Sequence, residues 1–317
     1  MKILANDGID PIGKALLEKA GFQVDTVTIP QNELAERLKE YDAITVRSAT
    51  KIRKELIDQV PNIKLIGRGG VGMDNIDVEY ARSKGIFVVN TPAASSVSVA
   101  ELVFAHFLGG VRFLFDANRQ MPVNGESMFN DLKKKYAAGI ELRGKTLGII
   151  GMGRIGSEVA KIGLGLGMKV IASDLSEGNK EVMMDIADHT FSIRIPNVSL
   201  QELLPQVDFL TLHIPGTSNH RPLLGKEEIS KIKKGAALVN TSRGGLVEEE
   251  ALMEALDNGH LAFAGLDVYE NEPKPSAKLL AHPKISFSPH IGASTLEAQE
   301  RIGNELAELI IHHLSLN

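Results

Sequence analysis

The stretch Thr146-Leu147-Gly148-Ile149-Ile150-Gly151-Met152-Gly153-Arg154-Ile155-Gly156 decides the fold predicted for this chain. A mostly apolar, strand-like run leads into the pattern Gly-x-Gly-x-x-Gly, and a helical pattern, Ser157-Glu158-Val159-Ala160, follows at once. The free N–H groups and the dipole at the start of such a helix can receive a pyrophosphate group. The stretch therefore predicts a strand, turn and helix that bind a dinucleotide.

The same glycine pattern occurs earlier, at Gly67-Arg68-Gly69-Gly70-Val71-Gly72, so the pattern alone cannot place the cofactor. A turn with acidic and amide side chains, Met73-Asp74-Asn75, follows this first copy, and the next expected strand ends at Asn90. After the second copy the next strand ends at Asp174. A carboxylate there can accept hydrogen bonds from ribose hydroxyls and would repel a 2′-phosphate. We therefore expect NAD at the second copy.

Short apolar runs alternate with helical patterns along the chain, which is typical of βαβ units. We expect strands at Lys2–Asn6, Phe22–Val27, Ala43–Arg47, Lys64–Gly67, Phe87–Asn90, Thr146–Ile150, Lys169–Asp174, Asp208–Ile214, Ala236–Ser242, Ala262–Val268 and Ile285–Ser288. The predicted fold class is α/β with two doubly wound parallel sheets. A flavodoxin-like substrate-binding domain would hold residues 1–97 and 291–317, and a Rossmann NAD-binding domain residues 98–290. A buried connecting helix is expected around Val99–Leu108, and a last helix, from Thr295 to about His313, should return to the first domain.

Composition excludes several classes of protein. The 317 residues suffice for two packed cores, and a formal charge of −5 argues against a nucleic-acid partner. Without cysteine there is no disulfide, thiolate metal site or thiol nucleophile, and no metal is expected. The chain opens on a strand-like run rather than a signal peptide, and nowhere do about eighteen apolar residues run together. We expect a cytoplasmic protein with no membrane partner.

Three polar residues lie at or just after expected strand ends, where an open α/β sheet places its chemistry: Arg243, Glu272 and His290. The guanidinium of Arg243, beside two glycines, suits a carboxylate bound through two hydrogen bonds. A histidine can exchange a proton with a carbonyl or hydroxyl oxygen, and Glu272 would orient that ring and raise its pKa. The alternatives are a loop anchor for Arg243, a core position for His290 and a solvated acid for Glu272.

The order of these residues resembles the D-isomer-specific 2-hydroxyacid dehydrogenase family. Arg243, the run Asp267-Val268-Tyr269-Glu270-Asn271-Glu272-Pro273 and the run Pro289-His290-Ile291-Gly292-Ala293 carry the resemblance, together with the second glycine pattern and His213-Ile214-Pro215-Gly216-Thr217. It implies hydride transfer between NAD and C2 of a small D-2-hydroxy acid, with Arg243, Glu272 and His290 as the catalytic set. The implied cofactor contacts are Gly151, Gly153, Arg154, Ile155, Gly156, Asp174, His213, Pro215, Thr217, Thr241, Ser242, Asp267, His290, Gly292 and Ala293.

Within that family the first domain resembles the phosphoglycerate dehydrogenases, through Asn6-Asp7-Gly8-Ile9, Arg47-Ser48-Ala49-Thr50-Lys51 and Arg68 to Asn75. This implies oxidation of D-3-phosphoglycerate in serine biosynthesis by a homodimer formed through the region Ser98–Phe115. Arg47 and Arg68 are cationic donors that a phosphate could use. The expected substrate contacts are Arg47, Ser48, Arg68, Gly70, Val71, Gly72 and Arg243. A glyoxylate/hydroxypyruvate or general D-2-hydroxyacid reductase remains an alternative, as does a NAD-sensing binding protein.

Overall fold

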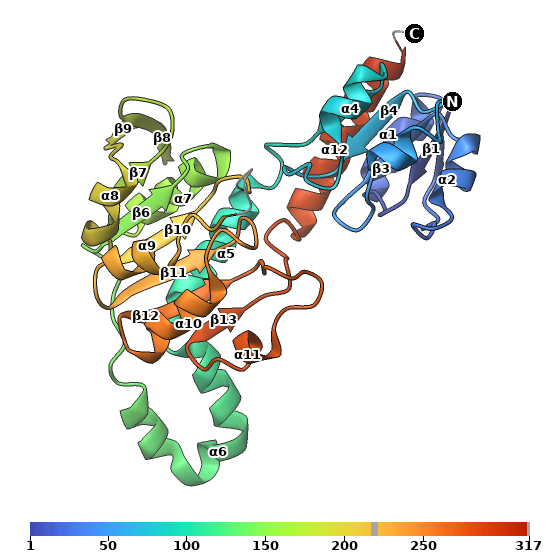
Figure 1. The fold of residues 1–317 in the computed structure, drawn as a ribbon. Helices are drawn as coiled ribbons and strands as arrows, with labels where there is room; N and C mark the ends of the chain where they lie inside the picture. The colour runs from blue at the N-terminus through green and yellow to red at the C-terminus, as the bar shows by residue number, and fades with distance from the viewer. Residues whose placement is uncertain (217–220, 316–317) are drawn as a thin grey trace. The chain divides into compact units, whose positions relative to one another are not determined.

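The computed structural model describes residues 1–216 and 221–315. It confirms the predicted α/β class, with helices covering two parallel sheets (Figure 1). Contacts within the chain define two compact units. The first unit holds Met1–Ser98 and Ala293–Asn317, and the second unit holds Val99–Gly292.

The first unit contains a five-stranded parallel sheet in the order β2-β1-β3-β4-β5, which is the flavodoxin-like order. Its strands are β1 (Lys2–Ala5), β2 (Gln23–Asp25), β3 (Ala43–Val46), β4 (Leu65–Arg68) and β5 (Phe87–Asn90). Its helices are α1 (Pro11–Lys19), α2 (Leu34–Arg37), the 3₁₀ turn η1 (Leu38–Glu40), α3 (Lys54–Ile57), α4 (Val78–Ser83) and α12 (Leu296–Ser315). Strand β3 is buried at every residue because helices cover both faces of the sheet.

Helices α1 and α12 lie side by side in the first unit (Figure 1). The carboxylate of Asp10 accepts the Ile12 N–H at 2.9 Å, and Pro11 occupies the first helical position, which together start α1. A Cβ added to Gly13 would lie 2.4 Å from the Gly303 carbonyl oxygen. Only glycine at position 13 therefore allows the C-terminal helix to approach this closely.

The second unit contains a six-stranded parallel sheet in the order β13-β12-β11-β10-β6-β7. Its strands are β6 (Thr146–Ile150), β7 (Lys169–Ser173), β10 (Phe209–Leu212), β11 (Ala236–Asn240), β12 (Leu261–Leu266) and β13 (Ile285–Phe287). Its helices are α5 (Ser96–Val111), α6 (Leu114–Lys135), α7 (Arg154–Gly165), α8 (Leu200–Leu203), η2 (Leu204–Gln206), α9 (Lys226–Lys231), α10 (Glu249–Asp257) and α11 (Ala277–Leu280). Every strand expected from the sequence is present in one of the two sheets.

An antiparallel hairpin, β8 (Lys180–Ile186) and β9 (His189–Ile195), lies between β7 and α8 in the chain and was not predicted. Val182 and Met184 are buried while the residues between and beside them are exposed, which is the alternation of a half-buried strand. After the hairpin the chain returns to the sheet edge, where Asn197 forms an isolated parallel bridge with Ala172.

Helix α6 extends away from the sheet of its own unit (Figure 1). It contains Pro122 and is broken at Met128, whose φ and ψ are −122° and 23°. Its exposed apolar side chains include Leu114, Val123 and Phe129. Among the described residues no single helix is both long and apolar enough to cross a bilayer; α5 and α6, bent by 56° at their junction, reach that length and apolar character only as a pair.

Candidate active site

The second glycine loop, Gly151–Gly156, joins β6 directly to α7. Gly151 has φ +91°, and a Cβ there would lie 2.6 Å from the His213 carbonyl oxygen. A Cβ on Gly156 would lie 2.1 Å from the Gly151 carbonyl oxygen, so helix and strand pack too closely for any side chain. Gly153, by contrast, has nothing within 4 Å of that position. The backbone at Gly153, just before the start of α7, is therefore accessible to a ligand, which fits a pyrophosphate group.

Asp174 follows β7 and lies beside this loop. Its carboxylate accepts the Met152 N–H at 2.7 Å and the Ser176 N–H at 2.9 Å, and it pairs with the Lys180 ammonium at 3.3 Å. Burial alone would raise the pKa of Asp174, but these donors outweigh it and hold the pKa well below its usual range. Asp174 is therefore a fixed negative charge next to the loop, as a ribose-binding carboxylate must be.

The loops after β6 and β10 meet where the strand order of the second unit diverges, because β7 lies on one side of β6 and β10 on the other. Ligands of open α/β sheets bind at such a switch point. His213 lies here, half-buried by solvent accessibility; desolvation of its ring lowers its pKa to about 3, so the ring is neutral. Its Nε2 is 3.1 Å from the Thr211 hydroxyl. Pro215 follows, and Thr217 lies outside the described residues.

The turn that carries Arg243 is built by Asn240, the last residue of β11. The Asn240 side-chain oxygen accepts the Ser242 N–H at 3.0 Å and its hydroxyl at 2.9 Å, while its Nδ2 donates to the Arg243 carbonyl at 2.9 Å. Thr241 and Ser242 are buried in this turn. The side chain of Asn240 thus fixes the backbone from which Arg243 projects.

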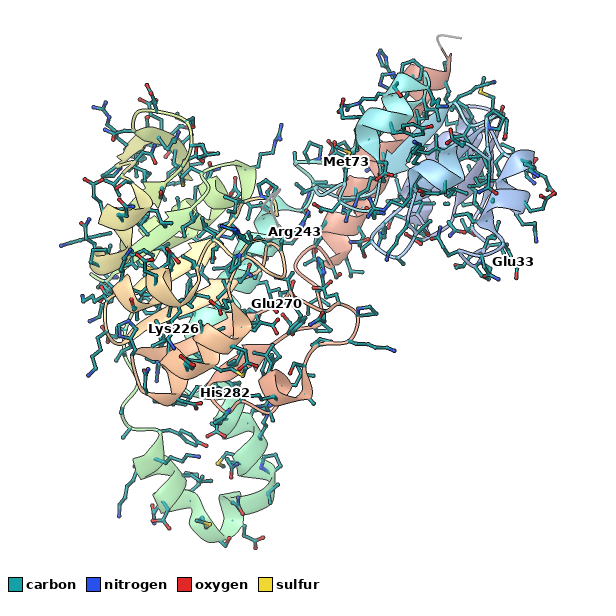
Figure 2. The ribbon with its side chains drawn as sticks, viewed as in Figure 1. Glu33, Met73, Lys226, Arg243, Glu270 and His282 are labelled. Atoms are coloured by element: carbon teal, nitrogen blue, oxygen red, sulfur yellow. The ribbon has the colours of Figure 1, made fainter. Side chains whose placement is uncertain are left out.

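Gly244 brings this turn against the loop that follows β12. A Cβ on Gly244 would lie 1.8 Å from the Tyr269 carbonyl oxygen, so only glycine permits the contact. Figure 2 shows Arg243 and Glu270 on the two adjoining loops. The charge of Arg243 acts on both Glu272 and His290, so the three predicted catalytic residues lie together.

Glu272 and His290 form a hydrogen-bonded ion pair, with His290 Nδ1 2.8 Å from Glu272 Oε2. The hydrogen bond to Glu272 raises the pKa of His290 in spite of partial burial. Burial would raise the pKa of Glu272, but the hydrogen bond and charge of His290 give a net lowering. Because Nδ1 faces Glu272, Nε2 is the nitrogen available to a substrate oxygen.

The backbone of His290 is in the left-handed region, with φ 55°. A non-glycine residue there costs on the order of 1–3 kcal/mol and needs support from its surroundings. Asp267, only 1% exposed, supplies it by accepting the Ile291 N–H at 2.9 Å and the Gly292 N–H at 2.8 Å. Ala293, the next predicted contact, belongs to the first unit.

In the first unit, Arg47 and Arg68 lie at the carboxyl ends of the neighbouring strands β3 and β4. Asp7 holds the first loop by accepting the Arg47 N–H at 2.6 Å. The Arg47 guanidinium donates to the Gln299 side-chain oxygen, and that of Arg68 donates to the Gly69 carbonyl at 3.1 Å. The structure thus brings these two arginines to one edge of the first sheet.

The other predicted substrate contacts lie in the same two loops. Ser48 is exposed beside Arg47, and Val71 is 37% exposed between Gly70 and Gly72. The side chain of Asn90 donates to the Val71 carbonyl at 2.8 Å, and this fixes the loop backbone. Arg243, the remaining predicted substrate contact, belongs to the second unit.

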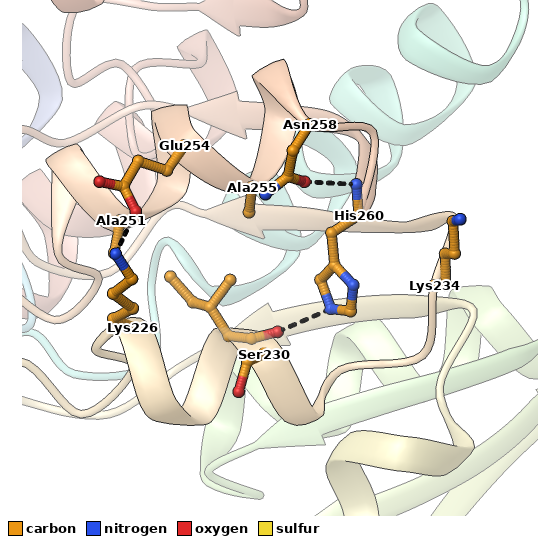
Figure 3. A pocket seen from close by; sticks show the side chains of 9 residues that line it. Lys226, Ser230, Lys234, Ala251, Glu254, Ala255, Asn258 and His260 are labelled. Atoms are coloured by element: carbon orange, nitrogen blue, oxygen red, sulfur yellow. Dashed lines mark hydrogen bonds and ion pairs between the residues drawn. The ribbon is translucent and has the colours of Figure 1, made fainter.

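A separate cavity of about 350 Å³ lies between α9 and α10 (Figure 3). Lys226 and Glu254 pair across it at 2.6 Å, and the His260 ring nitrogen lies 3.0 Å from the Ile229 carbonyl oxygen. Its lining, as far as the structure describes it, contains none of the predicted site residues. The Ser230 hydroxyl donates to the Glu227 carbonyl, so several of the polar groups in this cavity already have protein partners and we assign it no role in the chemistry.

Sequence reasoning missed several residues that support the site. Lys180 pairs with Asp174 from the unpredicted hairpin, and Gln299 reaches Arg47 from α12. His106 lies in the expected apolar helix, where a lone histidine gives no functional signal, yet it contacts Ser288 beside the turn of the predicted catalytic residue His290, called the catalytic turn below. Gln299 and His106 act on partners far away in sequence, and Lys180 lies in a hairpin that the sequence did not predict, so no local pattern marks these residues.

These features define an NAD-binding α/β protein whose Arg, Glu and His side chains meet at one sheet edge. Residues 104–292 match the model described as "D-isomer specific 2-hydroxyacid dehydrogenase, NAD binding domain". The chain is 40% identical over 319 residues to a hydroxypyruvate reductase of Thermotoga maritima, with 99% of each chain covered. It is 41% identical over 311 residues to a D-3-phosphoglycerate dehydrogenase of Methanocaldococcus jannaschii, covering 98% of this chain and 57% of that relative.

Solved structures agree. The TT0316 protein of Thermus thermophilus superposes with a TM-score of 0.85 at 32% identity, over 100% of this chain and 98% of that one. The D-lactate dehydrogenase of Aquifex aeolicus, complexed with NAD and lactic acid, gives 0.78 at 30% identity, over 99% and 96%. The chain belongs to the D-isomer specific 2-hydroxyacid dehydrogenase family, and its cofactor is NAD.

Proposed function

We propose that the protein interconverts D-3-phosphoglycerate and 3-phosphohydroxypyruvate, as a step of serine biosynthesis. The observation that carries the enzymatic part of the proposal is the Glu272–His290 pair beside Arg243. NAD, when bound, supplies the hydride acceptor. Arg243 binds the substrate carboxylate through its guanidinium, and His290 takes the proton of the C2 hydroxyl at Nε2. Glu272 keeps Nδ1 protonated and stabilises the imidazolium that forms.

The test of this chemistry is His290→Asn with Glu272→Gln beside it. Loss of a positioned acid–base group lowers kcat by about 10²–10⁴-fold, so His290→Asn should do so while NADH still binds, as measured by fluorescence titration. Glu272→Gln should lower kcat less and shift the pH profile to lower pH. Unchanged turnover in His290→Asn would contradict the proposed role of His290, whereas NADH binding without turnover of any 2-keto acid by the wild type would favour a NAD-sensing binding protein.

Arg47 and Arg68 support a phosphorylated substrate, since two guanidinium groups at adjacent strand ends are suited to phosphate. The decisive measurement is NADH oxidation with 3-phosphohydroxypyruvate and with hydroxypyruvate. A preference of about a hundredfold for the phosphorylated acid, about 2.7 kcal/mol in the transition state, supports the proposal. Equal rates would favour hydroxypyruvate reductase, the second candidate, which has the support of the Thermotoga maritima relative that matches over 99% of both chains.

We also propose that the protein is a homodimer. Helix α6, which follows α5 in the chain, would form part of the contact between the two subunits. Leu114, Val123 and Phe129 are 64%, 79% and 57% exposed, a large apolar area for one helix. Light scattering should give a dimer mass for the wild type and a monomer mass for Val123→Glu/Phe129→Glu. A wild-type monomer at micromolar concentration would contradict this part.

A further inference from the structure

A buried histidine on α5, His106, contacts the end of the sheet that carries the catalytic turn. Its side chain is 5% exposed. Nδ1 is 3.0 Å from the Ser286 hydroxyl and Nε2 is 3.0 Å from the Ser288 hydroxyl. Ser286 belongs to β13, and Ser288 directly follows that strand. Because both ring nitrogens are used inside the core, this histidine can influence the reaction only through its neighbours.

Each hydrogen bond in this cluster has one direction. The Ser288 hydroxyl is 2.6 Å from Asp267 Oδ1, and a carboxylate only accepts, so the hydroxyl proton points to Asp267. Ser288 must then accept from His106, which places the ring proton on Nε2. Burial lowers the pKa of His106, so the ring is neutral and Nδ1 accepts from Ser286. The cluster is therefore a one-way chain from Ser286 through His106 and Ser288 to Asp267.

The chain ends at the backbone of the catalytic turn. Besides the Ser288 hydroxyl, Asp267 accepts the N–H groups of Ile291 and Gly292, the two residues after His290. His290 itself has φ 55° and depends on this support. A change at His106 thus reaches His290 through two side chains, with no contact between His106 and the substrate.

We propose that His106 is a positioning residue for His290, acting through Ser288 and Asp267. The inference rests on the proposed role of His290 as acid and base. The charged groups that act on His290 are Glu272, Asp267 and Arg243, and Asp267 is the charged group that acts on His106. By supplying a donor to Ser288, His106 keeps the Ser288 hydroxyl turned toward Asp267. This fixes the position of the carboxylate beside the turn that carries His290.

Two substitutions should break the chain at successive links. His106→Leu removes the donor to Ser288, and Ser288→Ala removes the donor to Asp267. In each variant we expect kcat for keto-acid reduction to fall about tenfold and the pKa of His290 to fall, because the Asp267 carboxylate and the turn that it supports are no longer held in place. The combined variant should lose little more than either single variant, since both interrupt one chain.

Two further variants separate this role from plain packing. His106→Gln keeps an N–H donor near the Nε2 position and should recover most of kcat. Ser286→Ala removes a hydroxyl of the same size on the far side of the ring and is the matched control, with kcat within about twofold of the wild type. NMR titration of the His290 ring together with kcat between about pH 5 and 9 gives both readouts, and NADH affinity checks that the cofactor site is intact.

The outcomes are distinct. Wild-type kcat and a wild-type His290 pKa in both His106→Leu and Ser288→Ala would overturn the inference, and so would equal losses in Ser286→Ala and Ser288→Ala. If His106→Leu fails to fold, Ser288→Ala, which removes one oxygen atom, decides. Turnover that persists in His290→Asn would instead overturn the proposed function, whatever the result at His106.

Discussion

Two loops of this protein share the pattern Gly-x-Gly-x-x-Gly, but their surroundings differ. After β4, the first loop at Gly67–Gly72 leads into turns, and no helix begins until α4 at Val78. After β6, the second loop at Gly151–Gly156 runs directly into α7. In the first loop the Cβ positions of Gly67 and Gly69 face side chains of α12, whereas in the second Gly153 faces open space. Only the second loop presents helical N–H groups to a ligand.

The strand order adds a second difference. In the first unit the chain diverges between β1 and β3, where Asp7 binds the Arg47 loop, so the first glycine loop lies one strand away from the switch point. In the second unit the glycine loop follows β6, at the switch point itself. The family's NAD-binding domain, residues 104–292, contains the second loop and not the first. The position in the sheet, more than the glycine pattern, decides which loop holds the cofactor.

The largest expected effect separates the two loops directly. Gly156→Ala places a Cβ 2.1 Å from the Gly151 carbonyl oxygen, so α7 must shift away from β6. We expect the NADH dissociation constant to rise about a hundredfold or more, on the order of 2.7 kcal/mol. Gly69→Ala is the control, because its Cβ would meet side chains rather than backbone, the nearest being Ile302 at 3.2 Å. If Gly69→Ala weakened NADH binding as much as Gly156→Ala does, the distinction between the two loops would be wrong.

The second-largest expected effect is on recognition of the keto-acid substrate rather than on binding of the cofactor. Arg47→Met keeps much of the side-chain volume and removes the guanidinium. We expect the preference for 3-phosphohydroxypyruvate over hydroxypyruvate to fall about thirtyfold, or about 2 kcal/mol, because a charge-assisted hydrogen bond to phosphate is lost. The ratio of kcat/KM for the two acids measures this, with unchanged NADH affinity as the internal control. A large change in NADH affinity with an unchanged ratio would reverse the assignment of the two regions.

The sequence predicted the strands and the two sheets because parallel strands buried on both faces leave a clear record of apolar runs and glycine turns. The hairpin β8–β9 escaped prediction, since its strands are half exposed and its alternation of Lys180, Glu181, Val182, Met183 and Met184 lies between stronger signals. Helix α6 was also missed, because Pro122, Gly125 and several polar residues obscure its period.

For the site, the sequence named the residues to which we assign the chemistry but few of those that hold them in place. Strand ends are recognisable in a sequence, so Arg243, Glu272 and His290 could be placed at one sheet edge from their positions in the chain. The chain from His106 to Asp267 and the contact of Arg47 with Gln299 join elements distant in sequence. Such contacts depend on tertiary packing, which a local pattern does not encode.

A smaller effect on nucleotide affinity is expected from the residue that ends the strand after each glycine loop, which is Asp174 for the second loop and Asn90 for the first. Asp174→Asn removes the negative charge after β7, and we expect NADH affinity to fall about tenfold while NADPH binds more tightly than to the wild type. Asn90→Ala, at the end of the strand that follows the first loop, is the matched control and should leave both affinities within about twofold. Fluorescence titration with the two nucleotides measures this. Retained discrimination against NADPH in Asp174→Asn would mean that another group repels the 2′-phosphate.

The smallest effect concerns stability against pH. The pKa of Asp174 is lowered in the folded protein, so its ionised form stabilises the fold above the unfolded value of about 3.9, and this contribution is lost as the pH falls toward the folded value. Asp174→Asn lacks it. The free energy of unfolding of the wild type should therefore exceed that of the variant by about 1 kcal/mol at pH 6, with the difference shrinking below about pH 4. Urea unfolding at pH 6 and pH 3 measures it, and an equal difference at both would mean that the donors from Met152, Ser176 and Lys180 do not favour the charged carboxylate.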